Sequence, residues 1–275
     1  PAQNTFAEMT ARVKCRQVTG AQNLYALSGN RMMTTSASFG RMIRFLGMRF
    51  PSMRGVVGLD LGSSTTTLAV GKANQLTQFV ARWSGEVYIK AIQHWIPGLI
   101  TDEMIKEYLL YRSSYPASIP ATVEELEIEG AIAKVRIQQV IKAAAAAYPR
   151  LELGYGDGLN FGYDQIVVSG TALTGSPDMA AAMMVILDGF QPSGITSILL
   201  DQSNLLPVLG ACGQLAPALP EEVLEYNPMQ MLGTVISPVN FRKARTHLLK
   251  VRIEQDGKQD VQIEICPGDF MVIQL

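Results

Sequence analysis

The chain has 275 residues, of which 48% are hydrophobic and 17% are charged, and its 23 Lys and Arg residues nearly balance its 24 Asp and Glu residues. This length and composition are typical of a globular protein with one large domain or two ordinary ones, and they exclude intrinsic disorder. The balanced charge, and the lack of an apolar stretch of roughly 18 residues, indicate neither a nucleic-acid partner nor a membrane partner.

Helical and strand periods alternate along the first half of the chain. Apolar residues recur at helical spacing in two segments before residue 50, and Thr35 or Ser36 suits the N-cap of the second. Three short strand-like segments then predict an antiparallel meander, and three more helices follow, the last with Thr122 and Glu125 at capping-box spacing. The predicted ranges are 4–14 and 34–50 for the first helices, 54–61, 65–72 and 76–82 for the strands, and 85–96, 101–112 and 123–147 for the later helices.

In the second half, strands alternate with helices of ordinary length. The glycine-rich segment 154–162 precedes a strand rather than following one, so we predict a loop there. The following strand–helix–strand–helix series predicts a parallel sheet covered by helices. From residue 231 onward a two-residue alternation predominates, and Asp256-Gly257 is typical of a hairpin, which predicts a small β module. The series occupies 164–170, 176–190, 195–201 and 204–216.

The content of cysteine and histidine bears on metal binding and on the compartment. Cys15, Cys212 and Cys266 lie far apart without CxxC spacing, and neither His94 nor His247 has a partner at metal-ligand spacing. A zinc site or a disulfide framework is therefore not expected. The first residues lack the basic segment and apolar core of a signal peptide, so we predict a cytoplasmic protein.

The segment "GLDLGSSTTTLAV", residues 58–70, combines the residue types of a phosphate site. A glycine in a tight turn between strands exposes backbone N–H groups that bind anions, and the hydroxyls of Ser63, Ser64 and Thr65 add donors. Asp60, at the end of the incoming strand, can hold the water around a Mg²⁺ ion. The alternative is an ordinary hairpin, since Ser and Thr also favour strands and turns.

The run Asp60-Leu61-Gly62-Ser63-Ser64-Thr65 resembles the second phosphate-binding loop of the actin, sugar-kinase and heat-shock-70 ATPase superfamily. Segments 34–40 and 208–213 resemble its two connecting helices, and 166–175 resembles its adenosine loop. The resemblance implies an α/β fold, namely an actin-like (ribonuclease H-like) second lobe with a small C-terminal β module. The implied organisation is connecting helices in 1–50, the ATPase lobe in 51–230 and the β module in 231–275.

Within that superfamily the chain is most similar to MutL-type accessory proteins of coenzyme-B12-dependent glutamate mutase. The similarity rests on "SGTALTGSPD", "FQPSGITSILLDQSNLLPVLGA", "LGTVISPV" and the terminal "PGDFMVIQL". It implies part of an ATP-dependent, chaperone-like factor that reactivates a B12-dependent mutase, its partner. The alternative is a catalytically inactive actin-like lobe that acts as a protein-binding scaffold.

The resemblance also assigns roles to residues, with ATP and Mg²⁺ as cofactors. It implies that Asp60 is the catalytic group that holds Mg²⁺ through water, and that the phosphates lie on the turn while the nucleoside lies at the 169–172 corner. Two departures favour the scaffold alternative, namely Thr67 where an acidic residue is common and Thr171 where a second glycine is usual. The implied binding residues are Gly62, Ser63, Ser64 and Thr65 for the phosphates and Ser169, Gly170, Thr171 and Ala172 for the nucleoside.

The sequence holds no second copy of the Asp-x-Gly hairpin that the first lobe of these ATPases carries. We therefore expect the chain to be a C-terminal fragment of a longer ATPase. Alone, it is expected to bind nucleotide weakly and not to hydrolyse ATP.

Overall fold

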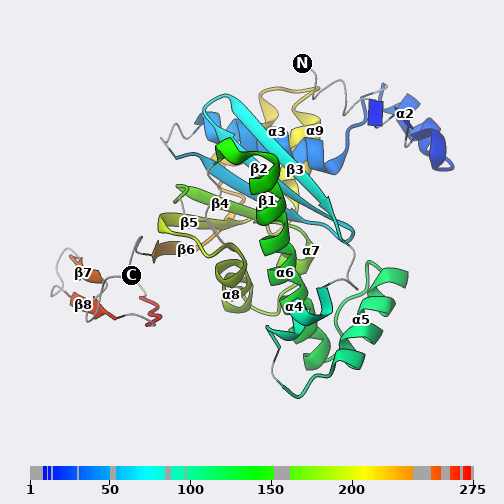
Figure 1. The fold of residues 1–275 in the computed structure, drawn as a ribbon. Coiled ribbons are helices and arrows are strands. Elements are labelled where there is room, and N and C mark those ends of the chain that lie inside the picture. Colours follow the sequence, from blue (N-terminus) through cyan, green and yellow to red (C-terminus); the bar gives the residue numbers. More distant parts are fainter. Residues whose placement is uncertain are drawn as a thin grey trace.

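The computed structural model describes residues 9–10, 12–13, 15–29, 31–49, 54–83, 88–96, 98–151, 162–237, 249–254, 261–266 and 269–273. A six-stranded mixed sheet, with the order β3-β2-β1-β4-β5-β6, forms the centre of this part of the chain (Figure 1). Its strands are β1 (Val56–Leu61), β2 (Thr65–Lys72), β3 (Gln75–Arg82), β4 (Gln165–Ser169), β5 (Gly194–Leu200) and β6 (Gln230–Ser237). The mixed α/β fold predicted from the sequence is confirmed.

The sheet joins an antiparallel meander to a parallel pair of strands. β1, β2 and β3 pair antiparallel, whereas β4 and β5 run parallel to β1, as their alternation with helices predicted. β6 pairs antiparallel with β5, so the prediction that this segment belongs to the C-terminal β module is wrong. The reason is that β5 would otherwise present an open edge, and β6 satisfies its backbone groups.

Helices cover both faces of the sheet (Figure 1). α6 and α8 pack on one face, whereas α3, α9 and α10 pack on the other. Along β1, Val57 and Leu59 enter the first core and Val56 enters the second, as the alternation of a strand requires. The helices are α2 (Ala21–Leu27), α3 (Thr35–Arg49), α4 (Ile89–Gln93), α5 (Asp102–Ser114), α6 (Val123–Ala147), α7 (Thr171–Thr174), α8 (Met179–Phe190), α9 (Leu205–Cys212) and α10 (Leu219–Glu225).

α3 and α9, which contain most of the two segments that resemble connecting helices, cross in close contact. The Ser38 hydroxyl donates a hydrogen bond to the Pro207 carbonyl, and Gly210 lies against the Ser38 main chain. The N-cap of α3 is Thr34, whose hydroxyl accepts the Ala37 N–H at 3.3 Å, rather than the predicted Thr35 or Ser36.

The long helix α6 connects the sheet with a separate helical module formed by α4, α5 and its own first half. Ile128 and Ile132 belong to the core of this module, whereas Ile137 and Val140 belong to the core under the sheet. The predicted capping at its start is present, since Thr122 Oγ1 accepts the Glu125 N–H at 3.2 Å. α6 therefore links two separately packed bodies.

The C-terminal part of the chain contains a second, two-stranded sheet. β7 (Leu249–Ile253) and β8 (Val261–Ile265) pair antiparallel. The predicted Asp256-Gly257 turn, His247, most of the helix predicted at 4–14 and nearly all of the loop at 154–162 lie outside the described residues. Among the described residues, no helix is long and apolar enough to cross a membrane.

Candidate functional site

A cavity of about 1130 Å³ opens at the edge of the sheet where β1 and β4 end. Its walls come from the β1–β2 turn, the N-terminus of α3, the α7–α8 region, and the α5–α6 connection together with α6. Eight of the nine residues predicted to bind a ligand line it. This position follows from the topology, since parallel neighbours β1 and β4 bring their carboxyl ends to the same edge.

The β1–β2 turn presents free backbone donors to this cavity. The N–H groups of Gly62, Ser63 and Ser64 have no acceptor within the described part of the chain. The carbonyls nearby are engaged, because Ser64 O accepts the Trp83 N–H at 3.0 Å and two others accept from an arginine. Consecutive unpaired N–H groups of this kind form an anion-binding nest. Thr65, the last predicted phosphate residue, is exposed at the start of β2.

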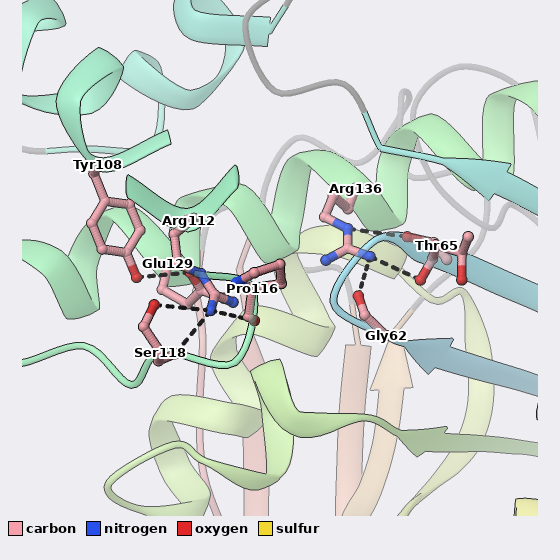
Figure 2. A network of polar contacts seen from close by, with 9 residues as sticks. Gly62, Thr65, Tyr108, Arg112, Pro116, Ser118, Glu129 and Arg136 are labelled. Carbon is pink, nitrogen blue, oxygen red and sulfur yellow. Dashed lines mark hydrogen bonds and ion pairs between the residues drawn. The ribbon is translucent and has the colours of Figure 1, made fainter. Parts of the chain in front are cut away.

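Arg136 of α6 holds the turn from behind, as Figure 2 shows. Its Nη2 donates to Gly62 O at 2.5 Å and to Thr65 O at 2.9 Å, and its Nε donates to Thr66 Oγ1 at 3.1 Å. Burial lowers the pKa of the guanidinium to about 10, so it keeps its charge at neutral pH. Sequence reasoning missed Arg136, although an arginine between the apolar residues Val135 and Ile137 of a predicted helix was a visible signal.

Asp60 lies at the end of β1, half-buried on the cavity wall. In register it stands opposite Thr67 of β2 and Ser169 of β4. Burial raises the pKa of its carboxyl, Arg136 opposes this rise, and Asp201 adds to it. A carboxylate in this position, beside free N–H donors, can hold the water shell of a Mg²⁺ ion that bridges phosphates.

At the β4–α7 corner the polar groups are tied to the protein rather than to the cavity. Ser169 is 0% exposed, and its hydroxyl lies 3.2 Å from Asp201 Oδ2 and 3.0 Å from Asn204 Oδ1. The Gly170 N–H donates to Asn204 Oδ1 at 2.8 Å. Ser169, which we expected to contact a nucleoside, instead fixes the corner. The Ser169 hydroxyl is held by Asp201, which is buried and also caps α9, and by Asn204, which lines the cavity.

Gly170, Thr171 and Ala172 do line the cavity. Gly170 has a φ of 106°, and a β-carbon there would stand 2.4 Å from the Leu61 carbonyl oxygen, so only glycine fits between β4 and β1. Thr171 is the first residue of α7, and its φ is not positive. A second glycine is therefore not needed at position 171.

Another wall of the cavity belongs to the α5–α6 connection and is held by a partly buried ion pair (Figure 2). Arg112 Nη2 lies 2.9 Å from Glu129 Oε1, while its Nη1 donates to Pro116 O at 2.7 Å and Ser118 O at 2.8 Å. Tyr108 donates to Glu129 Oε2 at 2.9 Å. The segment fixed in this way gives the cavity an apolar lining of Pro116, Ala117, Ile119 and Pro120.

Comparison with solved structures gives a weak likeness. No protein-family model matches the chain, and no curated protein matches it. A chain in a solved structure of a PilM-PilN type IV pilus biogenesis complex is similar at a TM-score of 0.33 and 14% identity, over 75% of this chain and 58% of that chain. The present chain thus spans less than two thirds of the length of that one.

Proposed function

We propose that this chain is the nucleotide-binding second lobe of an actin-like ATPase, and that its β1–β2 turn binds the phosphates of Mg-ATP. The observation that carries the proposal is the turn itself. The N–H groups of Gly62, Ser63 and Ser64 have no acceptor among the described residues, and they border a large cavity beside the Asp60 carboxylate. Such a nest favours a polyanion over a neutral ligand.

The shape and lining of the cavity also support a nucleotide. One wall carries free donors and a carboxylate, whereas the wall at the α5–α6 connection has an apolar part that includes Ile119, Pro116 and Pro120. Ligand sites usually combine an apolar lining with a few placed polar groups. A phosphate chain joined to a flat base matches these two walls, and the Gly170–Ala172 corner lies in the same cavity.

In this proposal Asp60 interacts with the metal ion, and Arg136 provides positive charge near the phosphates. Mg²⁺, when bound, neutralises phosphate charge and keeps part of its water shell. Asp60 would hold that shell as an acceptor, and an oxygen ligand of this type fits the preference of the ion. Arg136 would contribute positive charge from behind the turn. Three-residue clusters of His, Cys, Asp or Glu that could bind a metal directly are absent from the described ranges.

Amide NMR spectroscopy of this chain during titration with Mg-ATP tests the proposal at residue level. We expect saturable shifts that are largest for the amides of Gly62, Ser63 and Ser64. The turn at Ala73-Asn74 in the same meander is the matched control, because it does not line the cavity. Unchanged amides at 62–64 at millimolar Mg-ATP would contradict the proposal.

For the whole protein, we propose an ATP-dependent reactivating factor for a coenzyme-B12-dependent mutase. This step is supported by the sequence resemblance of segments 164–238 to the MutL-type accessory proteins. Substitution of Asp60 by Ala in the intact protein should lower ATP turnover about tenfold or more, since the group that orients the metal is lost. An unchanged turnover would remove Asp60 from the site.

The second candidate is an actin-like lobe without catalysis that binds a protein partner. The observation that favours it is Thr67, which stands opposite Asp60 where related lobes often have an acidic residue. Isothermal titration of the intact protein with Mg-ATP separates the two candidates. A saturable heat of Mg-ATP binding supports the ATPase, whereas the lack of any binding supports the scaffold.

A further inference from the structure

The feature that the proposed function leaves unexplained is the placement of Arg136. Its side chain is 3% exposed, so it pays the desolvation cost of a buried cation without touching the cavity. Its three hydrogen bonds all go to the β1–β2 hairpin, and two of them go to main-chain carbonyls. A buried arginine that is directed at backbone oxygens defines the shape of a turn.

The hydrogen bonds fix the direction of the peptide groups in the turn. The carbonyls of Gly62 and Thr65 point toward Arg136 on α6, and the Ser64 carbonyl points toward the Trp83 N–H. A peptide plane is rigid, so the Gly62 carbonyl that turns toward Arg136 turns the N–H of Ser63, which belongs to the same peptide group, to the other side. The direction of the free Ser63 N–H at the centre of the turn is therefore a consequence of where the Gly62 carbonyl is held, and the bond to the Thr65 carbonyl fixes the far end of the turn.

The position of Arg136 is secured independently of any ligand. α6 is packed in the sheet core through Ile137 and Val140, and the guanidinium lies 5.8 Å from the Trp83 ring. Asp60 and Glu129 provide negative charge around it. The arrangement of Arg136 and the turn is thus formed before a ligand binds. A pre-formed site lowers the free-energy cost of binding an anion.

We propose that Arg136 is the positioning residue of the phosphate turn: its guanidinium holds the Gly62 and Thr65 carbonyls so that the turn is shaped to bind a polyphosphate before the ligand arrives. This inference rests on the proposed function of the same turn. It adds that affinity for phosphate depends on a residue that does not contact the ligand.

Two substitutions on one helix test this role. Arg136→Met should weaken binding of Mg-tripolyphosphate and of Mg-ADP about tenfold, since two charge-assisted bonds to the turn are lost. Lys134→Met is the matched control, because it removes a largely buried cation from the same helix. The Lys134 ammonium group pairs with the Asp188 carboxylate at 2.7 Å. The control should lower thermal stability without changing either affinity. Tripolyphosphate isolates the turn, because it has no nucleoside.

Rescue distinguishes positioning from general damage. Guanidinium ion at tens of millimolar should restore tripolyphosphate binding to Arg136→Ala, whereas it should leave the wild-type affinity unchanged. If Arg136→Met does not fold, Arg136→Lys keeps the charge but not the fork of donors, and it should bind several-fold more weakly than wild type.

The outcomes separate this inference from the proposed function. Wild-type chain that binds neither probe overturns the proposed function and the role of Arg136 together. Wild-type chain that binds both probes, with Arg136→Met, Arg136→Ala and Arg136→Lys binding equally well, overturns only the role of Arg136. The role of Arg136 is supported if its variants bind both probes more weakly, if guanidinium restores binding to Arg136→Ala, and if Lys134→Met keeps the wild-type affinity.

Discussion

Gly210 of α9 lies directly against the main chain of Ser38 in α3, and a β-carbon at position 210 would stand 2.0 Å from the Ser38 carbonyl oxygen. The nearest atoms belong to backbone, so they cannot move aside as a side chain would. We expect Gly210→Ala to lower the free energy of unfolding by about 2–3 kcal/mol, the cost of overpacking at a rigid contact. Urea denaturation measures this change.

Gly130 of α6 provides the matched control for that prediction. Its added β-carbon would meet only Val185 Cγ2, at an ordinary 3.7 Å. Gly130→Ala should therefore stabilise the helix, by up to about 1 kcal/mol. If both variants unfold at the wild-type midpoint, the close crossing of α3 and α9 is not as tight as described.

The half-buried carboxyl of Asp60 should make the folded chain less stable at neutral pH than it would be with an amide. Burial raises the pKa of Asp60 above its ordinary value of 3.8. Above pH 4 the unfolded chain releases this proton more readily, so ionisation favours the unfolded state. We expect Asp60→Asn to raise the free energy of unfolding at pH 7 by about 0.5–1 kcal/mol.

The sign of this effect gives the check. At pH 3.5 the carboxyl is mostly protonated in both states, because this pH lies below the ordinary pKa of 3.8, so most of the gain from Asp60→Asn should be lost there. Parallel urea titrations at pH 3.5 and pH 7 compare the two conditions, and the same variant should lose Mg-dependent nucleotide binding. A variant that is less stable than wild type at pH 7 would show that Asp60 is held by favourable contacts instead.

Local patterns were sufficient to predict most of the sheet and its helices. The strands around Gly62 and the helix beginning at Val123 were predicted because turn chemistry and capping act within a few residues. The place of β6 was not predictable in the same way. Its alternation is equally typical of a strand in the C-terminal module, and only the open edge of β5 decides which partner it takes.

In the site, too, local features were predictable from the sequence, whereas long-range contacts were not. The turn at 62–65 and the corner at 170–172 carry recognisable residue types, but the partner of Arg136 lies about seventy residues away in the chain. A single sequence shows that a cation sits among apolar residues, and not which backbone oxygens it reaches. The role expected for Ser169 was not found for a related reason. Asp201 and Asn204 bind its hydroxyl only after β4 and β5 pair.

Trp83 should report on occupancy of the turn. Its backbone N–H donates to Ser64 O, and its ring stacks on Tyr88 with 5.0 Å between the ring centroids. The Arg136 guanidinium lies over the Trp83 ring. The chain has two tryptophans, so Trp95→Phe leaves Trp83 as the single emitter. We expect Mg-ADP to change its fluorescence saturably, because a bound phosphate shifts the electrostatic field at the turn.

The reciprocal variant is the control for this measurement. Trp83→Phe leaves Trp95, which lies near Lys134 in the helical module, at 4.8 Å from its ammonium nitrogen. Its emission should stay constant during the same titration. A constant signal from Trp83 with a changing signal from Trp95 would place the ligand at the module rather than at the turn.

The Tyr108–Glu129 hydrogen bond should make stability fall at alkaline pH. Burial, and then the Glu129 charge, raise the pKa of Tyr108 above its ordinary value of 10.0. Above pH 10 the unfolded chain ionises this phenol while the folded chain keeps its proton, so rising pH favours unfolding. Tyr108→Phe should cost about 1–2 kcal/mol at pH 7, through the lost bond to a carboxylate, and should lessen the loss between pH 9 and 11.

Tyr111 is the control, since it lies on the same helix and its side chain is exposed. Tyr111→Phe should leave both the stability at pH 7 and its alkaline slope unchanged. Urea midpoints across this pH range measure the two variants side by side. Because Glu129 also holds Arg112, which fixes the Pro116 and Ser118 carbonyls, loss of the Tyr108 bond should loosen the apolar wall of the cavity. Equal alkaline slopes for wild type and Tyr108→Phe would show that the phenol does not hold this network.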